Sequence, residues 1–238
     1  MFTFIAILFT FIILSFSKKN LSTNLTHIKK TFQPKTPNQK KFTDLLLNEN
    51  MKVILGLGVA GTGKTFLCAH NAITQLKNNQ IEKIVITRPL ITVNENMGFL
   101  PGSMNEKMDP YIQPIFDVFS SSYTKDQIQS LIKKNIIEIS PLGFMRGRTF
   151  TNSYIIADEM QNSSPEQMKM LLTRIGENTK LVITGDLNQT DYGTNNGLKD
   201  FFEKISNKKF KSIGWTVFND KDIQRSEIVK TIVKIYGS

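Results

Sequence analysis

The sequence contains Gly58-Val59-Ala60-Gly61-Thr62-Gly63-Lys64-Thr65, which fits the pattern G-x-x-x-x-G-K-[ST] at every fixed position. An apolar stretch, Lys52–Gly56, precedes this loop, and Lys64–Lys77 can form an amphipathic helix after it. Glycines let the backbone curl so that several N–H groups face one phosphate chain, and the helix N-terminus adds about half a positive charge there. The stretch therefore predicts a strand, a phosphate-binding loop and a helix, with Lys64 on the β- and γ-phosphates and the Thr65 hydroxyl on Mg²⁺.

Strand-like and helix-like stretches alternate through the rest of the chain. Short apolar runs bounded by turn residues predict strands at Lys52–Gly56, Lys83–Thr87, Ile136–Ser140, Tyr154–Ala157, Leu181–Thr184 and Trp215–Phe218. Apolar residues at helical spacing predict helices at Lys40–Leu47, Lys64–Lys77, Pro110–Phe119, Lys125–Lys133, Pro165–Ile175, Leu198–Ile205 and Ile223–Ile235. This alternation predicts a single α/β domain over residues 33–238, with a mostly parallel sheet and helices on both faces.

Two carboxylates follow the apolar strand at 154–157. A buried strand that delivers an acid at its carboxyl end suits the magnesium partner of a phosphate loop, so Asp158 is the expected metal-side acid, acting mostly through metal-bound water. Glu159 comes next and can polarise an attacking water as a general base. The alternative is that the acidic pair caps the following helix. Gln161 either couples the nucleotide state to a second ligand or only satisfies backbone groups.

A polar cluster also follows the strand at 181–184. Thr184, Asp186 and Gln189 could bond to the γ-phosphate, to its water or to neighbouring loops, and the sequence does not decide among these. The alternative is a local turn in which an Asp or Asn side chain bonds its own backbone. Because the carboxyl ends of parallel strands share one edge of a sheet, we expect this cluster beside the phosphate loop and the acidic pair.

The composition excludes several classes of protein. The chain has 238 residues with one cysteine and two histidines, so neither a disulfide framework nor a Cys/His zinc site can form. The formal net charge is +10. A positive surface favours nucleic acid or anionic lipid, but an excess of this size establishes neither.

The first seventeen residues form a separate apolar segment. Residues 1–17 carry no charged side chain, and Lys18 and Lys19 follow directly. A helix of this length reaches the lower limit for crossing a bilayer, and the lysines would then keep the rest of the chain on the cytoplasmic face. The alternatives are an apolar tail that does not insert, a start codon assigned too far upstream, or a targeting segment, although the basic start and cleavage site of a secretory signal are missing. Residues 18–32 are expected to be a polar, basic linker.

Taken together, these residues resemble the PhoH-like proteins, a group of RecA-fold P-loop ATPases similar to the first motor domain of superfamily-one helicases. Beyond the phosphate loop, the resemblance is carried by ordered strings at Thr87–Pro89, Gly98–Gly102, Glu106–Tyr111, Phe144–Thr149, Asp158–Asn162, Glu166–Lys169, Leu172–Arg174 and Thr184–Gln189. The resemblance implies a RecA-like domain, binding and Mg²⁺-dependent hydrolysis of ATP, and an RNA-related, helicase-like task on RNA or single-stranded nucleic acid. It also implies that the Gln39 side-chain amide reads adenine; the alternative is that Gln39 is a linker residue.

A single domain of this kind needs a further positive charge in its transition state. Such charge often comes in trans from an arginine of a neighbouring subunit, so we expect a homo-oligomer, such as a hexameric ring, with ATP at its interfaces. Arg225 is the first candidate, and Arg146 and Arg148 are the second. Arg88, at the end of the second predicted strand, is placed either to grip a nucleic-acid backbone or to form a structural salt bridge.

Three functions therefore compete. The leading one is an ATPase at the cytoplasmic face that acts on RNA or a ribonucleoprotein. The second is a small-metabolite kinase, which is disfavoured because Glu159 is placed to activate water. The third is an ATP-gated scaffold without turnover, with membrane contact through residues 1–17.

Overall fold

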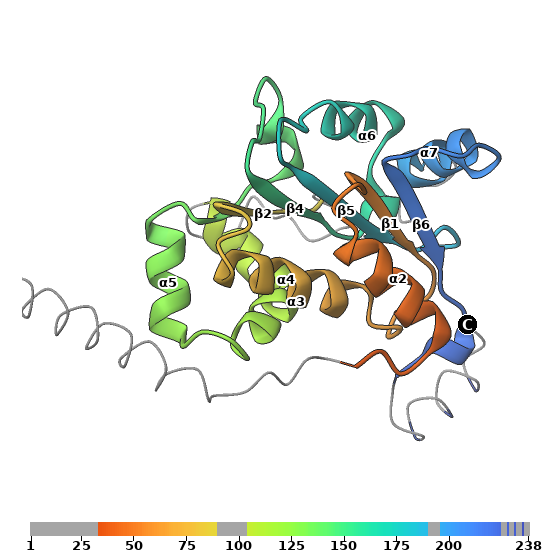
Figure 1. Ribbon diagram of the computed structural model, residues 1–238, viewed down its shortest axis with the longest axis horizontal. Coiled ribbons are helices and arrows are strands. Elements are labelled where there is room, and N and C mark those ends of the chain that lie inside the picture. The colour runs from red at the N-terminus through yellow and green to blue at the C-terminus, as the bar shows by residue number, and fades with distance from the viewer. Residues whose placement is uncertain are drawn as a thin grey trace, which may run out of the picture. The chain divides into compact units, whose positions relative to one another are not determined.

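One parallel sheet organises the described part of the chain, which comprises residues 33–89, 104–189 and 196–224 and positions 228, 231 and 235 of the computed structural model. Within these residues the strand order is β3-β2-β4-β5-β1-β6, and all neighbours are parallel. The strands are β1 (Val53–Leu57), β2 (Lys83–Thr87), β3 (Ile137–Ile139), β4 (Ser153–Ala157), β5 (Lys180–Gly185) and β6 (Ile213–Val217), shown in Figure 1.

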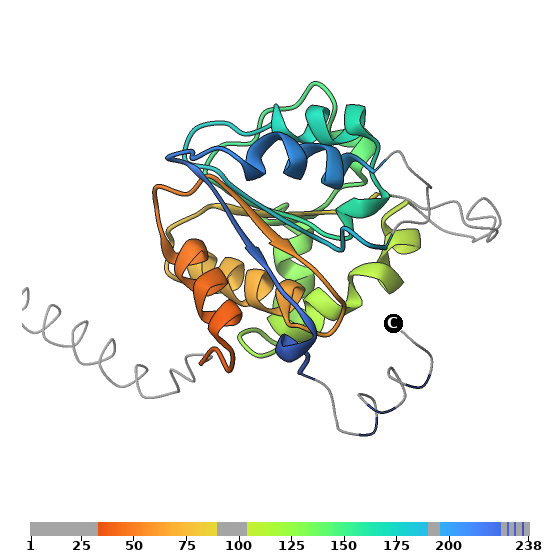
Figure 2. The same ribbon diagram turned by 90° about the vertical axis from the view of Figure 1, so that its right-hand side faces the viewer.

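Helices cover both faces of this sheet. Figures 1 and 2 show α2 (Pro37–Leu47), α3 (Lys64–Lys77), α4 (Met104–Phe119) and α5 (Lys125–Lys133) on one face, and α6 (Pro165–Leu172) and α7 (Gly197–Ser206) on the other. Short 3₁₀ turns occur at η2 (Leu142–Met145), η3 (Met160–Asn162) and η4 (Asp220–Asp222). The predicted α/β fold is confirmed. Because both faces are covered, β1 and β4 are buried at every residue, which explains their unbroken apolar sequences.

Helix ends differ from the predicted ones for local reasons. Helix α2 begins at Pro37 because the Thr36 hydroxyl accepts a hydrogen bond from the Gln39 N–H and a proline in the first turn needs no N–H partner. Helix α6 ends at Leu172, before the predicted Ile175, because the backbone there turns to pair with Phe150. Helix α4 already begins at Met104, so the prediction that Pro110 opens it is wrong.

Three predicted segments lie wholly or largely outside the described residues. They are the apolar segment 1–17, the linker 18–32 and the helix at 223–235, of which positions 228, 231 and 235 are helical. Among the residues that the structure describes, no helix combines the length and the apolar character needed to span a membrane.

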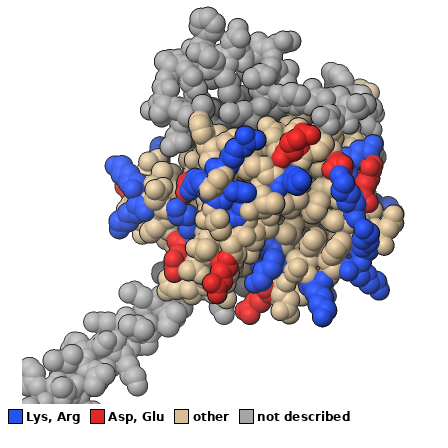
Figure 3. All heavy atoms as spheres, turned by 90° about the horizontal axis from the view of Figure 1, so that it is seen from above, with Lys and Arg blue, Asp and Glu red and all other residues tan. Residues whose placement is uncertain are grey.

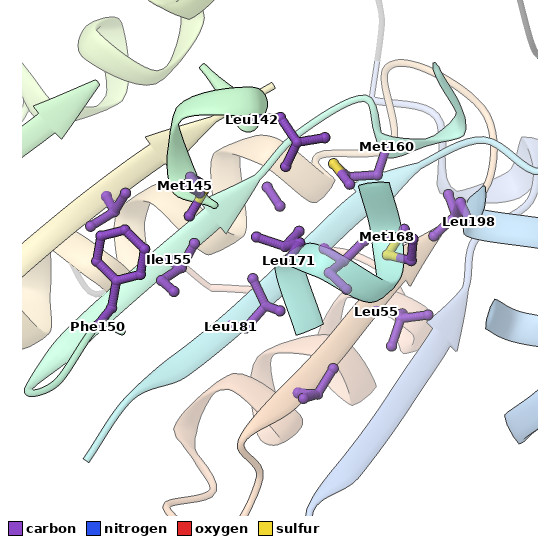
Figure 4. Packing of buried hydrophobic residues seen from close by; sticks show 14 of the residues in the cluster. Leu55, Leu142, Met145, Phe150, Ile155, Met160, Met168, Leu171, Leu181 and Leu198 are labelled. Carbon is purple, nitrogen blue, oxygen red and sulfur yellow. The ribbon is translucent and has the colours of Figure 1, made fainter. Parts of the chain in front are cut away.

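A buried apolar cluster holds the middle strands against α6 and α7. Figure 4 shows Leu55, Ile155 and Leu181 from β1, β4 and β5 facing Leu171 of α6 and Leu198 of α7. Each of these side chains is fully buried, and such burial contributes roughly 1.5–3 kcal/mol per side chain. The cluster fixes β4, β5 and β1 as neighbours in register, so their carboxyl ends lie side by side.

A buried lysine lies at the opposite, amino edge of the same strands. The Lys180 ammonium donates to the carbonyls of Leu46 and Asn48 at the end of α2, at 2.6 and 3.2 Å. Burial, together with the nearby Lys52 charge, lowers the pKa of Lys180 from 10.5 to about 8, and Glu49 opposes this shift. Below about pH 8 Lys180 is therefore charged in the folded chain, and burying this charge lowers the stability of the fold.

This charge predicts a pH-dependent stability. Between about pH 8 and 10.5 the unfolded chain keeps the Lys180 proton that the folded chain has lost, so stability rises with pH. The free energy of unfolding of the wild type minus that of Lys180→Met should therefore increase by up to about 1.4 kcal/mol per pH unit across this range. Urea unfolding at several pH values measures the gain.

The matched control is Lys77→Met, which removes an exposed lysine at the end of α3. Its difference from the wild type should not change with pH. A Lys180→Met curve parallel to that of the wild type would show that Lys180 titrates in the folded protein as it does in the unfolded one.

Candidate functional site

The loop after β1 curls around an open pocket. Gly58, Gly61 and Gly63 have φ values of 123°, 80° and 89°, which lie in the left-handed region that favours glycine. A side chain at Gly58 is also excluded by space, because a Cβ there would lie 2.2 Å from the Phe218 carbonyl oxygen. The loop geometry therefore requires the glycines that the motif supplies.

Lys64 reaches back over this loop from the first turn of α3. Its ammonium donates to the carbonyls of Gly58 and Val59, at 2.5 and 2.7 Å. Burial lowers the pKa of Lys64. The charges of three carboxylates, Glu159, Asp186 and Asp158, oppose this effect without reversing it. One lysine thus lies among three acids, two from the tip of β4 and one from the tip of β5.

The Asp158 carboxylate joins the three strand tips. The Thr65 hydroxyl donates to Asp158 Oδ1 at 3.0 Å, and the Thr184 hydroxyl donates to the same oxygen. Hydroxyl and carboxylate oxygens are the ligands that Mg²⁺ prefers, usually one or two of them together with phosphate and water. No group of three or more acids, histidines or cysteines able to hold a metal occurs in the described ranges. Thr65 and Asp158 therefore fit a Mg²⁺ ion that also binds phosphate.

Glu159 leaves the strand in a rare backbone conformation. Its φ and ψ are 54° and 40°, in the left-handed region, which is uncommon for residues other than glycine. The turn directs the half-buried Glu159 side chain to the pocket instead of along β4. Such strain is frequent where a side chain must be aimed at a ligand.

The third tip contributes one buried acid and one exposed amide. Asp186 is 4% exposed, and its Oδ1 accepts from the Asn188 N–H at 3.0 Å, in the local turn that the sequence left open. Its Oδ2 has no partner among the described residues. Gln189 is exposed and lines the pocket. Thr184 points at Asp158, so it is not available to a phosphate in this arrangement.

The pocket that these residues surround has a volume of about 220 Å³. It is lined by Gly58, Ala60, Gly61, Gly63, Lys64, Thr65, Phe66, Asp158, Glu159, Gly185, Asp186 and Gln189. The structure thus brings together the phosphate loop, the acidic pair and the third tip. A phosphate chain bound here would meet the N–H groups of the loop and the N-terminus of α3.

Gln39 is placed behind the loop instead of in the pocket. It is 1% exposed, its amide Nε2 donates to the Thr62 carbonyl at 3.0 Å, and its Oε1 accepts from the Lys35 N–H at 2.8 Å. Both ends of the amide are therefore used within the protein. Adenine recognition by Gln39 stays a prediction.

A clasp that the sequence did not reveal holds the outer side of the loop. Asp222 of η4 accepts hydrogen bonds from the Thr36 hydroxyl and the Asn38 amide of the α2 start, at 2.5 and 2.8 Å. The next turn of chain follows the loop itself, since the Gln224 N–H donates to the Gly61 carbonyl at 2.9 Å. Burial raises the pKa of Asp222, but these hydrogen bonds outweigh it and lower the pKa overall. One signal in the sequence was Thr36-Pro37, a typical helix start.

The candidate arginines that the structure describes do not line the pocket. Arg225 is outside the described residues. Arg148 forms a two-bond ion pair with Glu138 of β3, at 2.5 and 2.9 Å, and its guanidinium lies 4.5 Å from the Phe150 ring centre. Arg146 is exposed, and Arg88 is half-buried after β2; neither lines the pocket. A role in trans for Arg225, Arg146 or Arg148 stays a prediction, as does a nucleic-acid contact or a structural salt bridge for Arg88.

The family model described as PhoH-like protein matches residues 31–237. The chain belongs to the PhoH-like family. It is 39% identical over 209 residues to a PhoH-like protein of Bacillus subtilis, covering 87% of this chain and 64% of that protein. It is 39% identical over 213 residues to one of Mycobacterium tuberculosis, covering 87% and 58%. With protein PhoH of Escherichia coli the identity is 36% over 193 residues, covering 79% and 54%.

The family predicted from the sequence is therefore confirmed. The chain spans between about half and two thirds of the length of these relatives. Their names describe the family and state no activity. Membership in this PhoH-like family thus supports the P-loop fold, while activity and partners have to be argued from the site.

The clasp predicts that Asp222→Ala destabilises the domain. The substitution leaves the Thr36 hydroxyl and the Asn38 amide without their acceptor, and because both are half-buried the expected loss is about 1 kcal/mol. Urea unfolding near neutral pH measures this loss. Asp220→Ala is the matched control, because Asp220 is an exposed acid in the same turn. Equal losses for the two variants would contradict a specific role of Asp222.

Proposed function

We propose that the chain is a Mg²⁺-dependent ATPase whose hydrolysis drives an RNA-related, helicase-like task. The observation that carries this proposal is the placement of Lys64, Thr65, Asp158 and Glu159 around one pocket at the carboxyl ends of β1 and β4. Phosphoryl transfer needs little covalent chemistry from a protein, and positioning with charge stabilisation supplies most of the rate. These four residues provide both.

Each side chain has a role that follows from its chemistry. The loop N–H groups and the Lys64 ammonium bind the β- and γ-phosphates, with Lys64 exchanging its bonds to the loop carbonyls for bonds to phosphate oxygens. Thr65 and Asp158 hold Mg²⁺, which when bound neutralises charge on those oxygens.

Glu159 takes a proton from the attacking water. The water oxygen then bonds to the γ-phosphorus as the bond to the ADP oxygen breaks. The products are ADP and inorganic phosphate. Glu159 returns its proton to solvent.

The nucleotide and the assembly are further parts of this proposal. ATP is favoured over other triphosphates by the family resemblance, and Gln39 is the candidate adenine contact, for which its amide would have to release the Thr62 carbonyl and the Lys35 N–H. A homo-oligomer, such as a hexameric ring, would let Arg225 or the pair Arg146 and Arg148 reach a neighbouring pocket. In this arrangement the positive charge needed by the transition state comes from the next subunit.

RNA or single-stranded nucleic acid is the proposed partner. Figure 3 shows one face of the molecule, on which basic side chains are more widespread than acidic ones. The segment after α7 exposes Lys208, Lys209 and Lys211 around Phe210, which is itself 39% exposed. Lysines suit phosphates and an aromatic ring suits an unstacked base, so this segment supports the proposal.

Two substitutions test the ATPase directly. Lys64→Ala removes the phosphate contact and Glu159→Gln removes the general base, so each should lower the rate of phosphate release from ATP and Mg²⁺ by about tenfold or more. Glu166→Gln, an exposed acid on α6, is the control and should keep the wild-type rate.

The same assay separates the competing functions. Wild-type turnover in both variants would mean that the site is elsewhere. Phosphate transferred to an added nucleoside or sugar instead of to water would indicate a kinase. Tight ATP binding without turnover, even with RNA present, would indicate a scaffold.

Binding to nucleic acid has its own test. Single-stranded RNA with a fluorescent label should bind the protein in an anisotropy assay, and the affinity should fall as salt rises because lysine contacts release counterions. Comparing RNA with single-stranded DNA, with and without ATP, shows whether the nucleotide controls binding. An affinity that does not change with salt concentration, or no binding in any nucleotide state, would contradict the proposed partner.

A further inference from the structure

Gln161 forms an amide bridge between two of the three strand tips. Its Nε2 donates to Glu159 Oε2 at 2.5 Å, and its Oε1 accepts from the Asp186 N–H at 3.2 Å. The first partner belongs to the tip of β4 and the second to the tip of β5. A carboxamide carries a donor and an acceptor in one rigid plane, so the two contacts cannot move independently.

The surrounding structure leaves space for this bridge and little else. Gln161 is 4% exposed and belongs to η3, directly after the strained Glu159. A Cβ on Gly185 would lie 2.6 Å from Gln161 Oε1 and 2.5 Å from Leu198 Cδ2. The glycine at the end of β5 is therefore needed for the amide to approach, and the amide is confined once it is there.

The choice of partners distinguishes the bridge from a glutamine that only satisfies backbone groups. Its donor end goes to a carboxylate that lines the pocket, not to a carbonyl. Its acceptor end goes to the N–H of Asp186, whose own carboxylate also lines the pocket and has an oxygen without a partner among the described residues. Both contacts thus end at groups that would sense a bound phosphate.

We propose that Gln161 is a positioning residue that sets the Glu159 carboxylate for its proton transfer and links it to the tip of β5. This inference rests on the proposed ATPase function. One Glu159 oxygen is held by the amide, which orients the other toward the pocket. A shift of the β5 tip when phosphate leaves would move the amide and, with it, the general base. Gln161 is not among the described residues that line the pocket, so it acts through Glu159.

The test compares two substitutions of similar size. Gln161→Met keeps the length and fills the buried space but loses both hydrogen bonds, whereas Gln161→Glu keeps an acceptor for the Asp186 N–H but replaces the donor to Glu159 with a second carboxylate, whose charge repels that of Glu159. Each should lower kcat for ATP by about tenfold to hundredfold, because a misplaced base loses alignment with its proton. For Gln161→Met, which adds no charge, the Kd of a non-hydrolysable ATP analogue should change by less than about threefold, since the loop and Lys64 are untouched.

Controls separate positioning from folding. Gln167→Ala removes a glutamine of the neighbouring helix cap, where it only bonds backbone, and should change stability without changing kcat. Gln161→Met in a Glu159→Gln background should lower the residual rate no further, because the residue acts through the group already removed. Circular dichroism melting shows whether each variant is folded.

Each outcome decides a different claim. Loss of kcat that is equally large in both backgrounds, or a loss confined to ligand affinity, would overturn the positioning role while leaving the ATPase intact. Unchanged kcat in both Gln161 variants would do the same. No turnover by the wild type would overturn the proposed function and this inference with it.

Discussion

The site depends on one oxygen atom of Asp158. It accepts hydrogen bonds from Thr65, in the first turn of α3, and from Thr184 of β5, while Asp158 itself directly follows β4. Three segments that are far apart in the sequence therefore meet at a single carboxylate. A carboxylate is an acceptor only, so both hydroxyls must turn their protons toward it, which orients the lone pairs of Thr65 away from Asp158 and toward the pocket. Any cation bound there would extend this existing arrangement of oxygens.

Packing remote from the pocket makes this meeting possible. The apolar side chains of β1, β4 and β5 are anchored against α6 and α7, so the strands cannot slide past one another without exposing them. On the other face, Phe42 of α2 stacks edge-on against Phe218 at 5.5 Å between ring centres, next to the Asp222 clasp. The phosphate loop is therefore held from the sheet below and from α2 and η4 behind. The glycines of the loop, which are in the left-handed conformation, contribute backbone alone to the pocket.

The sequence predicted the local motifs and, through the parallel sheet, the meeting of the three strand tips, but it missed individual contacts between distant side chains. The loop at 58–65 and the acidic pair were visible because each motif needs only adjacent residues in a strand–turn context. The Asp222 clasp was not visible, because Thr36 and Asp222 are 186 residues apart and neither is unusual where it stands. For Gln161 the sequence offered two readings, and only the structure shows that its donor meets Glu159. The predicted end of α6 was wrong for the same reason, because Phe150, from a distant loop, pairs with the backbone of Ile175.

The charges of the pocket constrain how a nucleotide could enter it. Among the described residues that line the pocket Lys64 is the one cation, and it faces Asp158, Glu159 and Asp186, so the formal charge of these lining residues is negative. A bare triphosphate would add further negative charge beside three buried or half-buried acids, which is unfavourable at low dielectric. A triphosphate that arrives with Mg²⁺ brings compensating charge to Thr65 and Asp158, where oxygen ligands already converge. The three acids that disfavour free phosphate are thus the same ones that would select a metal-bound nucleotide. The amide of Gln161 keeps one of these acids, Glu159, aligned.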